Sequence, residues 1–430
     1  MDIKVTTANR LKGTAKLPGD KSISHRALLI GALAEGESQI HGFLDAADPI
    51  STLSCLAHLG VDISKTGTSI TVYGRGLRAL RAPAKTLDAG NSGTTIRLLS
   101  GVLAGQPFSS SITGDGSLRK RPMKRIVDPL TKMGASISTA PSQTAPLTIQ
   151  GSYPLRPLNF EMQYPSAQVK SCVLLAGLFA DGITSVTEKT ATRDHTERML
   201  GLSRIEGQHG IKVMVEGGLR IPARVYQIPA DISSAAFIIA AASIVPGSEV
   251  QILNVGLNPT RSRIIDLFRK LGASIEVARM EVMAGEPIGD LVVRSCELHG
   301  DVVLDSNDVA ELIDEIPIIA TTLAVSGLSL VVRGGTDLRN KETDRIKAVV
   351  TNLRGLGADV EEYSDGFAFQ GKKTLIPAPC KSFGDHRIAM AFGVAGLGLK
   401  GETTIVDAEC VDISFPTFWD LIGQLQTFKY

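Results

Sequence analysis

The sequence has 430 residues, with 45 Lys and Arg against 44 Asp and Glu, which gives a formal net charge of +1. A chain of this length exceeds what one hydrophobic core usually holds, so we expect two or more domains. A charge near zero argues against general nucleic-acid binding, which needs an excess of Lys and Arg.

No segment has the pattern of an export signal or a membrane anchor. The first residues, 1–5, lack the apolar core of a signal peptide. The longest apolar run, 235–245, stops at Pro246, short of the roughly 20 residues that span a bilayer. The five cysteines are scattered without a CxxC pair, as is typical of reduced thiols. We therefore expect a cytoplasmic protein with neither membrane nor nucleic acid as partner.

Helices that end at a glycine and lead into a strand recur along the chain. In each copy the apolar residues have helical spacing, a glycine able to adopt a positive φ follows, and a half-buried strand comes next. The copies occupy 49–63, 125–137, 263–275 and 345–360, with a weaker copy at 196–213 and a helix without its strand at 418–425. The expected helix-ending glycines are Gly60, Gly134, Gly210, Gly272 and Gly357. Their spacing is too long for a solenoid and fits units of βαβαββ size, three in each half.

Two similar transitions from strand to helix mark where the halves meet. Residues 17–26 and 228–237 each end a strand at a proline and then open an alanine-rich helix with Asp and Ser. We expect an α/β fold with one domain at 19–229 and a second at 1–18 plus 230–430. The functional site should lie in the cleft between them.

The first helix start, PGDKSISHR at 18–26, carries groups suited to an anion. Free backbone N–H groups at the start of a helix attract negative charge, and Lys21, Ser22 and Arg26 add cationic and hydroxyl donors. The alternative is an ordinary capped helix with surface charges. The segment alone favours neither interpretation.

Two further segments of the first half carry anion-binding groups. In DAGNSGTTIR at 88–97, Gly93 lets a ligand approach the backbone and Asn91 supplies a donor. In RKRPMKR at 119–125, Arg121 lies beside a helix start, where a cation is unfavourable unless it faces an anion. The alternatives are a capped turn for the first and a solvated helix end for the second.

The first half also has helix starts at 165–171 (PSAQVKS) and 192–198 (TRDHTER). The first places small polar groups before a very apolar helix. In the second, Asp194 and Glu197 resemble a capping box. Capping does not explain Arg193, which directly precedes them.

The second half contains carboxylates in unusual surroundings. In IDEIPII at 313–319, Asp314 and its neighbour interrupt an aliphatic run, where a charge is costly without a partner or a chemical task. An N-cap explains one of the two acids. RNKETDR at 339–345 and GDHRIAM at 384–390 string acids and bases around helix starts, and salt-bridged caps are the alternative there.

Taken together, these helix starts concentrate cations in a chain with almost no net charge. Such clustering makes sense for a ligand that carries several negative charges, and Asp314 and Glu342 are suited to moving protons. No pair of His, Cys or acidic residues has a zinc-binding spacing. The residues therefore predict binding of polyanionic small molecules and group transfer by acid–base chemistry, without a metal. The cations are Lys21, Arg26, Arg121, Arg193, Lys341, Arg345 and Arg387.

Eight phrases in fixed order (PGDKSISHR, GNSGT, RPM, SAQVKS, TRDHTE, DEIPIIA, KETDRI and GDHRIAM) closely resemble the 5-enolpyruvylshikimate-3-phosphate synthase family, its bacterial class II members in particular. The resemblance covers essentially the whole chain. It implies two similar domains, each of three βαβαββ units around a pseudo-threefold axis, the enolpyruvyl transferase fold. It also implies transfer of the enolpyruvyl group of phosphoenolpyruvate to the 5-hydroxyl of shikimate 3-phosphate in the shikimate pathway, with release of phosphate and no cofactor. We expect a monomer.

The resemblance also implies roles for individual residues. Asp314 would be the base for the 5-hydroxyl, with Lys21 as an open alternative, and Glu342 would protonate the methylene carbon. Shikimate 3-phosphate would be held by Lys21, Ser22, Arg26, Ser166, Ala167, Gln168, Arg193, Asp314 and Lys341. Phosphoenolpyruvate would be held by Lys21, Asn91, Gly93, Arg121, Gln168, Arg345 and Arg387.

One position departs from the family pattern. Many relatives carry a Lys shortly before the Ser-Phe-Pro near the C-terminus, whereas here Asp412 and Ile413 precede Ser414. Gly93 occupies a position where a bulkier residue in the family lowers glyphosate binding, so we expect inhibition by glyphosate in competition with phosphoenolpyruvate.

Two rival functions follow from the same fold. The fold relative that transfers enolpyruvyl to UDP-N-acetylglucosamine uses a loop cysteine, and the corresponding stretch here, 110–125, has none. The other rival is a non-catalytic anion-binding relative. It would bind the ligands without turnover.

Overall fold

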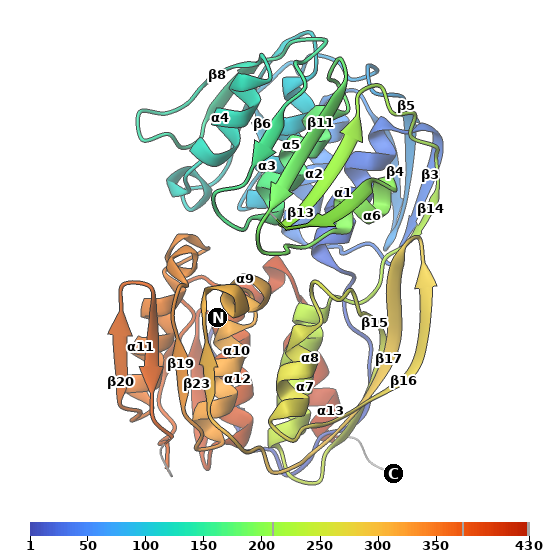
Figure 1. Ribbon diagram of the computed structural model, residues 1–430. Coiled ribbons are helices and arrows are strands. Elements are labelled where there is room, and N and C mark those ends of the chain that lie inside the picture. Colours follow the sequence, from blue (N-terminus) through green and yellow to red (C-terminus); the bar gives the residue numbers. More distant parts are fainter. Residues whose placement is uncertain (209, 372–373, 428–430) are drawn as a thin grey trace. The chain divides into compact units, whose positions relative to one another are not determined.

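The computed structural model describes residues 1–208, 210–371 and 374–427 (Figure 1). The chain divides into two compact units, each with its own hydrophobic core. The N-terminal unit comprises Gly19–Ile228 and Met283–Glu286. The C-terminal unit comprises Met1–Pro18, Pro229–Val282 and Pro287–Tyr430.

Three four-stranded sheets with the same topology form the N-terminal unit. In each, the first two strands in spatial order are parallel and the others antiparallel. In spatial order, the first sheet contains β14 (Val225–Gln227), β3 (Glu35–His41), β5 (Ser69–Arg75) and β4 (Asp62–Thr66). The second contains β6 (Leu87–Asp88), β7 (Ser109–Thr113), β9 (Leu147–Gln150) and β8 (Ser136–Ser138). The third contains β10 (Asn159–Glu161), β11 (Ile183–Glu188), β13 (Gly210–Glu216) and β12 (Ser203–Gly207).

Buried helices form the centre of this unit, and shorter helices follow them along the chain. The buried helices are α1 (Lys21–Leu33), α3 (Gly93–Ala104) and α5 (Ala167–Gly177). The others are α2 (Ala47–His58), the 3₁₀ turn η1 (Leu118–Lys120), α4 (Lys124–Lys132) and α6 (His195–Leu200). Each buried helix begins with a side-chain cap, from Asp20, Ser92 and Ser166 respectively. At Gly101 a Cβ would lie 2.2 Å from the carbonyl oxygen of Cys172, so only glycine permits the observed approach of α3 to α5.

The C-terminal unit repeats the same sheet topology, with one strand fewer among its described residues. Its first sheet contains β2 (Lys12–Ala15), β15 (Glu249–Gly256), β17 (Glu286–Arg294) and β16 (Ser274–Met283). The second contains β18 (Val302–Leu304), β19 (Leu330–Val332), β21 (Gly366–Phe369) and β20 (Val360–Tyr363). The third contains β22 (Cys380–Lys381), β23 (Glu402–Val406) and β1 (Ile3–Thr6). Strands β1 and β2 therefore bring the start of the chain into two sheets of this unit.

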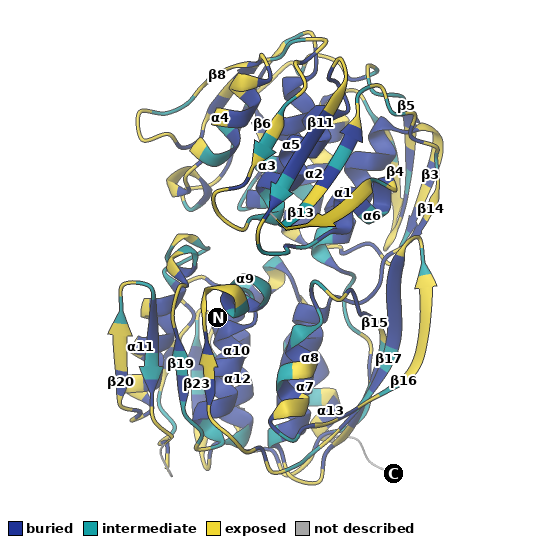
Figure 2. Cartoon of the chain, viewed as in Figure 1, coloured by how far each residue is buried: buried dark blue, intermediate teal, exposed yellow. Residues whose placement is uncertain are grey.

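The helices of the C-terminal unit follow the same division into buried and outer elements. The buried helices are α7 (Ile232–Ile244), α10 (Ile316–Val325) and α12 (His386–Gly398). The outer elements are α8 (Arg263–Lys270), α9 (Ser306–Leu312), η2 (Thr336–Asn340), α11 (Arg345–Gly355), η3 (Ala408–Ile413) and α13 (Phe418–Thr427). Figure 2 shows β16 and β20 largely exposed, as expected of edge strands. Among the described helices, none has the length and apolar character to cross a membrane.

The repeat predicted from helix-ending glycines is confirmed at four positions and wrong at one. Gly60, Gly134, Gly272 and Gly357 follow their helices with positive φ. The prediction for Gly210 is wrong: α6 ends at Leu200, and Gly201 with a φ of 67° terminates it. Gly210 instead begins β13, and its neighbour His209 lies outside the described residues. The last described element is α13, which ends at Thr427.

Candidate active site

The predicted site residues fall into two groups, one in each unit. Those of the N-terminal unit are Lys21, Ser22, Arg26, Asn91, Gly93, Arg121, Ser166, Ala167, Gln168 and Arg193. Those of the C-terminal unit are Asp314, Lys341, Glu342, Arg345 and Arg387.

Helix α1 presents its cations from the first two turns. Lys21 is the first residue of α1, and its Nζ lies 3.1 Å from Oδ2 of Asp48 on α2. Arg26, one turn further, is buried. Its Nη1 donates to the carbonyl oxygen of Ser22 at 2.9 Å, its Nε to Oγ1 of Thr196 at 2.8 Å, and its Nη2 to Oγ of Ser171 at 2.8 Å. These three contacts fix the plane of the guanidinium.

The residues around the start of α3 form a connected group. Arg121 donates from Nη2 to Oδ1 of Asn91 at 2.8 Å, so these two predicted residues are in contact. A Cβ on Gly93 would lie 2.7 Å from Nη1 of Arg97 and 3.2 Å from Nη1 of Arg121. The absence of a side chain at residue 93 therefore leaves room for both guanidinium groups.

Arg97 was not predicted as a site residue, although it ends the segment DAGNSGTTIR. Its Nη1 donates to Oε1 of Gln168 at 2.6 Å, and Nε2 of Gln168 donates to Oγ1 of Thr94 at 3.0 Å. Arg97 thus ties the predicted residue Gln168 on α5 to the group at the start of α3. The signal in the sequence was a cation inside a glycine-rich helix start.

The start of α5 and the segment before α6 carry the remaining residues of this unit. Ser166 is the N-cap of α5, and Ala167 is its first residue. Arg193 is half-buried in the segment between β11 and α6. Asp194 is the N-cap residue of α6, but the predicted capping box is wrong, because its side chain makes no cap hydrogen bond. Asp194 instead accepts from Nε of Arg198 at 2.8 Å, and Glu197 pairs with Lys170.

In the C-terminal unit, Arg345 is surrounded by three carboxylates. This arginine is the first residue of α11, and its side chain is 2% exposed. Its Nη1 donates to Oδ1 of Asp314 at 3.1 Å, its Nη2 to Oε2 of Glu342 at 2.6 Å, and its Nε to Oδ2 of Asp385 at 2.8 Å. Burial alone lowers the pKa of the Arg345 guanidinium, but the negative charges of Asp385, Glu342 and Asp314 outweigh it and raise the pKa above its usual value. Arg345 is therefore a permanent cation that holds both predicted acid–base residues.

Lys341 and Arg387 complete this group through Asp314. Nζ of Lys341 lies 3.4 Å from Oδ1 of Asp314. Nη1 of Arg387 donates to the backbone oxygen of Asp314 at 3.0 Å, and its Nη2 lies 3.8 Å from Oδ2. All predicted site residues of the C-terminal unit thus belong to one cluster with Asp314 in contact with its three cations.

Two acids of this cluster were not assigned a role from the sequence. Asp385 caps α12, accepts from the backbone N–H of Arg387 at 2.9 Å and also holds Arg345. Glu315 is buried, accepts a hydrogen bond from Oγ of Ser233, and lies 3.8 Å from Nη1 of Arg387. In each case the signal in the sequence was an acid beside a predicted site residue, and for Asp385 a salt-bridged cap was an equally good explanation.

Asp412, the position noted above as a departure from the family pattern, lies exposed in η3. Among the described residues, no set of three or more His, Cys, Asp or Glu side chains is arranged to hold a metal ion. Arg345 lies between Asp314, Glu342 and Asp385, so a cation of the chain itself already occupies the space between these three acids.

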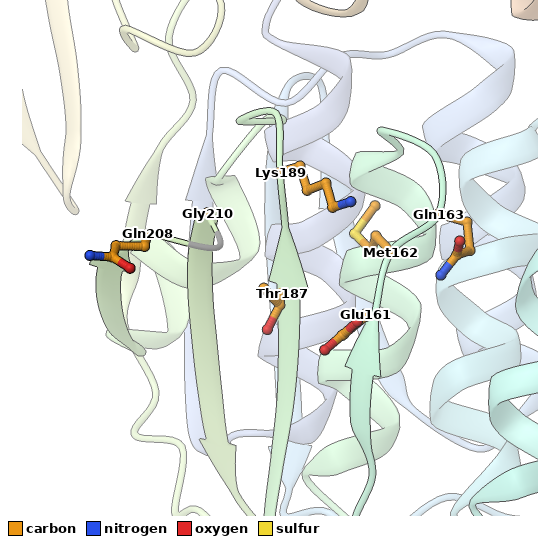
Figure 3. A pocket seen from close by; sticks show the side chains of 7 residues that line it. All are labelled: Glu161, Met162, Gln163, Thr187, Lys189, Gln208 and Gly210. Carbon is orange, nitrogen blue, oxygen red and sulfur yellow. The ribbon is translucent and has the colours of Figure 1, made fainter.

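One pocket of the N-terminal unit is lined by none of the predicted site residues. It opens beside the ends of β10 and β11, and most of its side chains are polar (Figure 3). It is lined by Glu161, Met162, Gln163, Thr187, Lys189, Gln208 and Gly210. We assign it no part in the chemistry.

Comparison with known proteins identifies the family. A family model described as EPSP synthase (3-phosphoshikimate 1-carboxyvinyltransferase) matches residues 5–422. A protein of Desulforamulus reducens named 3-phosphoshikimate 1-carboxyvinyltransferase is 46% identical over 428 residues, which cover 99% of each chain. One of Salinibacter ruber with the same name is 48% identical over 425 residues, which cover 98% of each. A solved EPSP synthase from Acinetobacter baumannii matches with a TM-score of 0.86 and 40% identity, over 99% of this chain and 98% of that one. As its motifs predicted, the chain belongs to the EPSP synthase family.

Proposed function

We propose that this chain transfers the enolpyruvyl group of phosphoenolpyruvate to the 5-hydroxyl of shikimate 3-phosphate and releases phosphate. This is the reaction of a 3-phosphoshikimate 1-carboxyvinyltransferase in the shikimate pathway of aromatic amino acid biosynthesis. The observation that carries the proposal is the cluster in which one buried cation, Arg345, contacts both Asp314 and Glu342. The family match supports the same reaction.

The cations of both groups are proposed to bind the negative charges of the two substrates. Phosphate and carboxylate groups form strong charge-assisted hydrogen bonds with arginine and lysine. Shikimate 3-phosphate is held by Lys21, Ser22, Arg26, Ser166, Ala167, Gln168, Arg193, Asp314 and Lys341. Phosphoenolpyruvate is held by Lys21, Asn91, Gly93, Arg121, Gln168, Arg345 and Arg387.

The addition step forms one carbon–oxygen bond and moves two protons. The 5-hydroxyl oxygen of shikimate 3-phosphate bonds to C2 of phosphoenolpyruvate as Asp314 removes its proton, and Glu342 donates a proton to the methylene carbon. The product of this step is a tetrahedral intermediate with a methyl group. Lys21 is the alternative base for the hydroxyl.

The elimination step reverses the proton transfer at carbon. Glu342 takes a proton from the methyl group, the double bond re-forms, and the bond between C2 and the phosphate oxygen breaks. Arg121, Arg345 and Arg387 offset the charge that develops on the departing phosphate. Glu342 ends the cycle protonated again, with any one of the three methyl protons, and the proton that Asp314 took from the hydroxyl passes to the departing phosphate.

The test is a phosphate-release assay with two acceptors. With phosphoenolpyruvate present, we expect release of phosphate when shikimate 3-phosphate is added and none with UDP-N-acetylglucosamine. Release with the second acceptor alone would overturn the proposal. Binding of shikimate 3-phosphate without any release would support a non-catalytic relative instead.

We further propose that the protein acts as a monomer in the cytoplasm and that domains 19–229 and 1–18 plus 230–430 share one catalytic cycle. The five cysteines are all free thiols, which suits a reducing compartment. Light scattering of the purified protein tests the monomer, and a mass near twice 45.5 kDa contradicts it.

A further inference from the structure

Lys170 lies in the segment PSAQVKS but has no place in the chemistry proposed above. Its side chain is on α5 and is 0% exposed. Its Nζ lies 2.7 Å from Oε1 of Glu188 at the end of β11 and 2.7 Å from Oε1 of Glu197 on α6. It also donates to the carbonyl oxygen of Thr192 at 3.2 Å. One buried cation therefore joins a strand, a helix and the segment that leads to Arg193.

Lys170 and Glu188 together bind three groups of Thr192: its carbonyl oxygen, its backbone N–H and its hydroxyl. While Lys170 holds its carbonyl oxygen, Oε2 of Glu188 accepts from its N–H at 3.2 Å and from its Oγ1 at 2.6 Å. Thr192 is 8% exposed, so these bonds are shielded from water. Since Arg193 is the next residue, its backbone starts from a fixed position.

A second link connects this ion pair to Arg26. Ser171 follows Lys170 on α5, and Thr196 precedes Glu197 on α6. Oγ1 of Thr196 donates to Oγ of Ser171 at 2.7 Å, beside the contact between Lys170 and Glu197. The same two hydroxyl groups accept the hydrogen bonds from Nε and Nη2 of Arg26. The distance between α5 and α6, which the ion pair sets, thus determines the plane of the Arg26 guanidinium.

We infer that Lys170 and Glu188 are positioning residues for shikimate 3-phosphate. They touch no substrate; they fix Thr192, and through it Arg193, while Lys170 and Glu197 fix the hydroxyl pair that orients Arg26. The inference rests on the proposed roles of Arg193 and Arg26 in binding shikimate 3-phosphate. Pre-organised donors lose little freedom when the ligand arrives, so loosening them costs affinity.

A purely structural role for the ion pairs of Lys170 with Glu188 and Glu197 makes a different prediction. Buried ion pairs also hold secondary-structure elements together, and removing one partner destabilises the fold strongly. In that case a variant unfolds at a lower temperature, but its folded molecules bind shikimate 3-phosphate as well as the wild type does. Affinity measured on folded protein therefore separates the two roles.

The first test changes the Thr192 hydroxyl alone. Thr192→Val keeps the volume of the side chain but removes the 2.6 Å bond to Glu188. We expect the dissociation constant of shikimate 3-phosphate, measured by calorimetric titration, to rise about tenfold. We expect kcat and the KM for phosphoenolpyruvate to change by less than about twofold. Thr192→Ser, which restores the hydroxyl, should bind like the wild type.

The matched control is Thr184→Val, the same change at another buried threonine of the same unit. Thr184 is fully buried, and its Oγ1 accepts from the N–H of Leu158 at 3.4 Å rather than bonding to Glu188. We expect it to leave the affinity for shikimate 3-phosphate unchanged. An equal loss of affinity in both valine variants would overturn the inference.

Arg193→Met separates failure of the inference from failure of the proposed site. If Arg193→Met leaves the affinity for shikimate 3-phosphate unchanged, the binding role of Arg193 is wrong, and the inference falls with it. If Arg193→Met weakens binding and Thr192→Val does not, the binding role stands and the positioning role is wrong. Weakened binding in both, with recovery in Thr192→Ser, supports the positioning role.

Discussion

Nη1 of Arg345 donates to Oδ1 of Asp314 at 3.1 Å, so the cation expected to hold phosphoenolpyruvate orients the carboxylate expected to act as base. The two residues are 31 positions apart in the sequence. Arg345 starts α11, whereas Asp314 lies just before α10. In the proposed mechanism, this contact couples the binding of phosphoenolpyruvate to the removal of the hydroxyl proton.

The first prediction concerns Asp314. Asp314→Asn keeps the shape of the side chain but cannot accept the hydroxyl proton, so we expect kcat to fall by roughly 100- to 10,000-fold. Phosphate release at saturating substrates measures it. Asp365→Asn, at a partly exposed acid of the same unit paired with Arg333, is the control and should remain active. If Asp314→Asn retains full turnover while Lys21→Met loses it, Lys21 is the base.

Glu342 should control exchange at carbon. Glu342→Gln cannot donate or take the proton of the methylene carbon, so the variant should incorporate deuterium from D₂O into phosphoenolpyruvate or product at least about 100-fold more slowly. Mass spectrometry of the recovered substrate and product measures the label. Incorporation at the wild-type rate would assign the carbon proton to another group.

A methyl group at residue 93 should disturb the phosphoenolpyruvate site. In Gly93→Ala the new Cβ would lie 2.7 Å from Nη1 of Arg97 and 3.2 Å from Nη1 of Arg121, so one guanidinium must move. We expect the KM for phosphoenolpyruvate to rise about 10- to 100-fold. Gly116→Ala, where a Cβ would meet no atom within 4 Å, is the matched control and should behave as the wild type.

The same pair of variants tests inhibition by glyphosate. We predict that glyphosate competes with phosphoenolpyruvate in the wild type and in Gly116→Ala, and that Gly93→Ala binds it more weakly. Initial rates at varied phosphoenolpyruvate and inhibitor measure this. No inhibition of the wild type at millimolar glyphosate would refute the prediction.

His25 should make stability depend on pH. Burial first, then the charges of Lys21 and Arg26, hold the pKa of His25 well below its ordinary 6.5 in the folded chain. The unfolded chain therefore binds a proton below pH 6.5 that the folded chain does not. Above pH 6.5 this difference does not lower the free energy of unfolding. As the pH drops from 6.5 toward the pKa of His25 in the folded chain, the free energy of unfolding falls by at most about 1.4 kcal/mol per pH unit.

The measurement is the melting temperature at pH 7.5 and pH 5.5. We expect the acid-induced decrease to be smaller in His25→Asn than in the wild type. In His58→Asn, a change at the exposed end of α2, the melting temperature should fall between pH 7.5 and pH 5.5 by as much as in the wild type. An unchanged decrease in His25→Asn would show that other groups dominate the acid response.

Local signals in the sequence predicted much of the fold. Gly60 and Gly134 end helices at positive φ because no side chain opposes that conformation, and this requirement is visible in the sequence alone. Gly210 was misassigned because α6 is short, so Gly201 ends it and the later glycine serves a hairpin strand. Repeat length could not distinguish the two glycines.

The site was predicted less completely than the fold, because its contacts join distant parts of the chain. Arg97 bonds to Gln168 across 71 positions, and Arg345 to Asp385 across 40. The sequence around one helix start shows that a charged side chain is present, but it does not show which distant side chain is its hydrogen-bond or ion-pair partner. The partners of Lys170 were hidden for the same reason, since its segment reads as part of an apolar helix.

The most direct test of the proposed site is a crystal structure with shikimate 3-phosphate and phosphoenolpyruvate bound to Glu342→Gln. We predict the 5-hydroxyl oxygen at about 3 Å from Asp314 or Lys21, the 3-phosphate on Arg193 and Arg26, and the methylene carbon facing residue 342. Shikimate 3-phosphate bound away from Arg26 and Arg193, with its 5-hydroxyl out of reach of both Asp314 and Lys21, would contradict it.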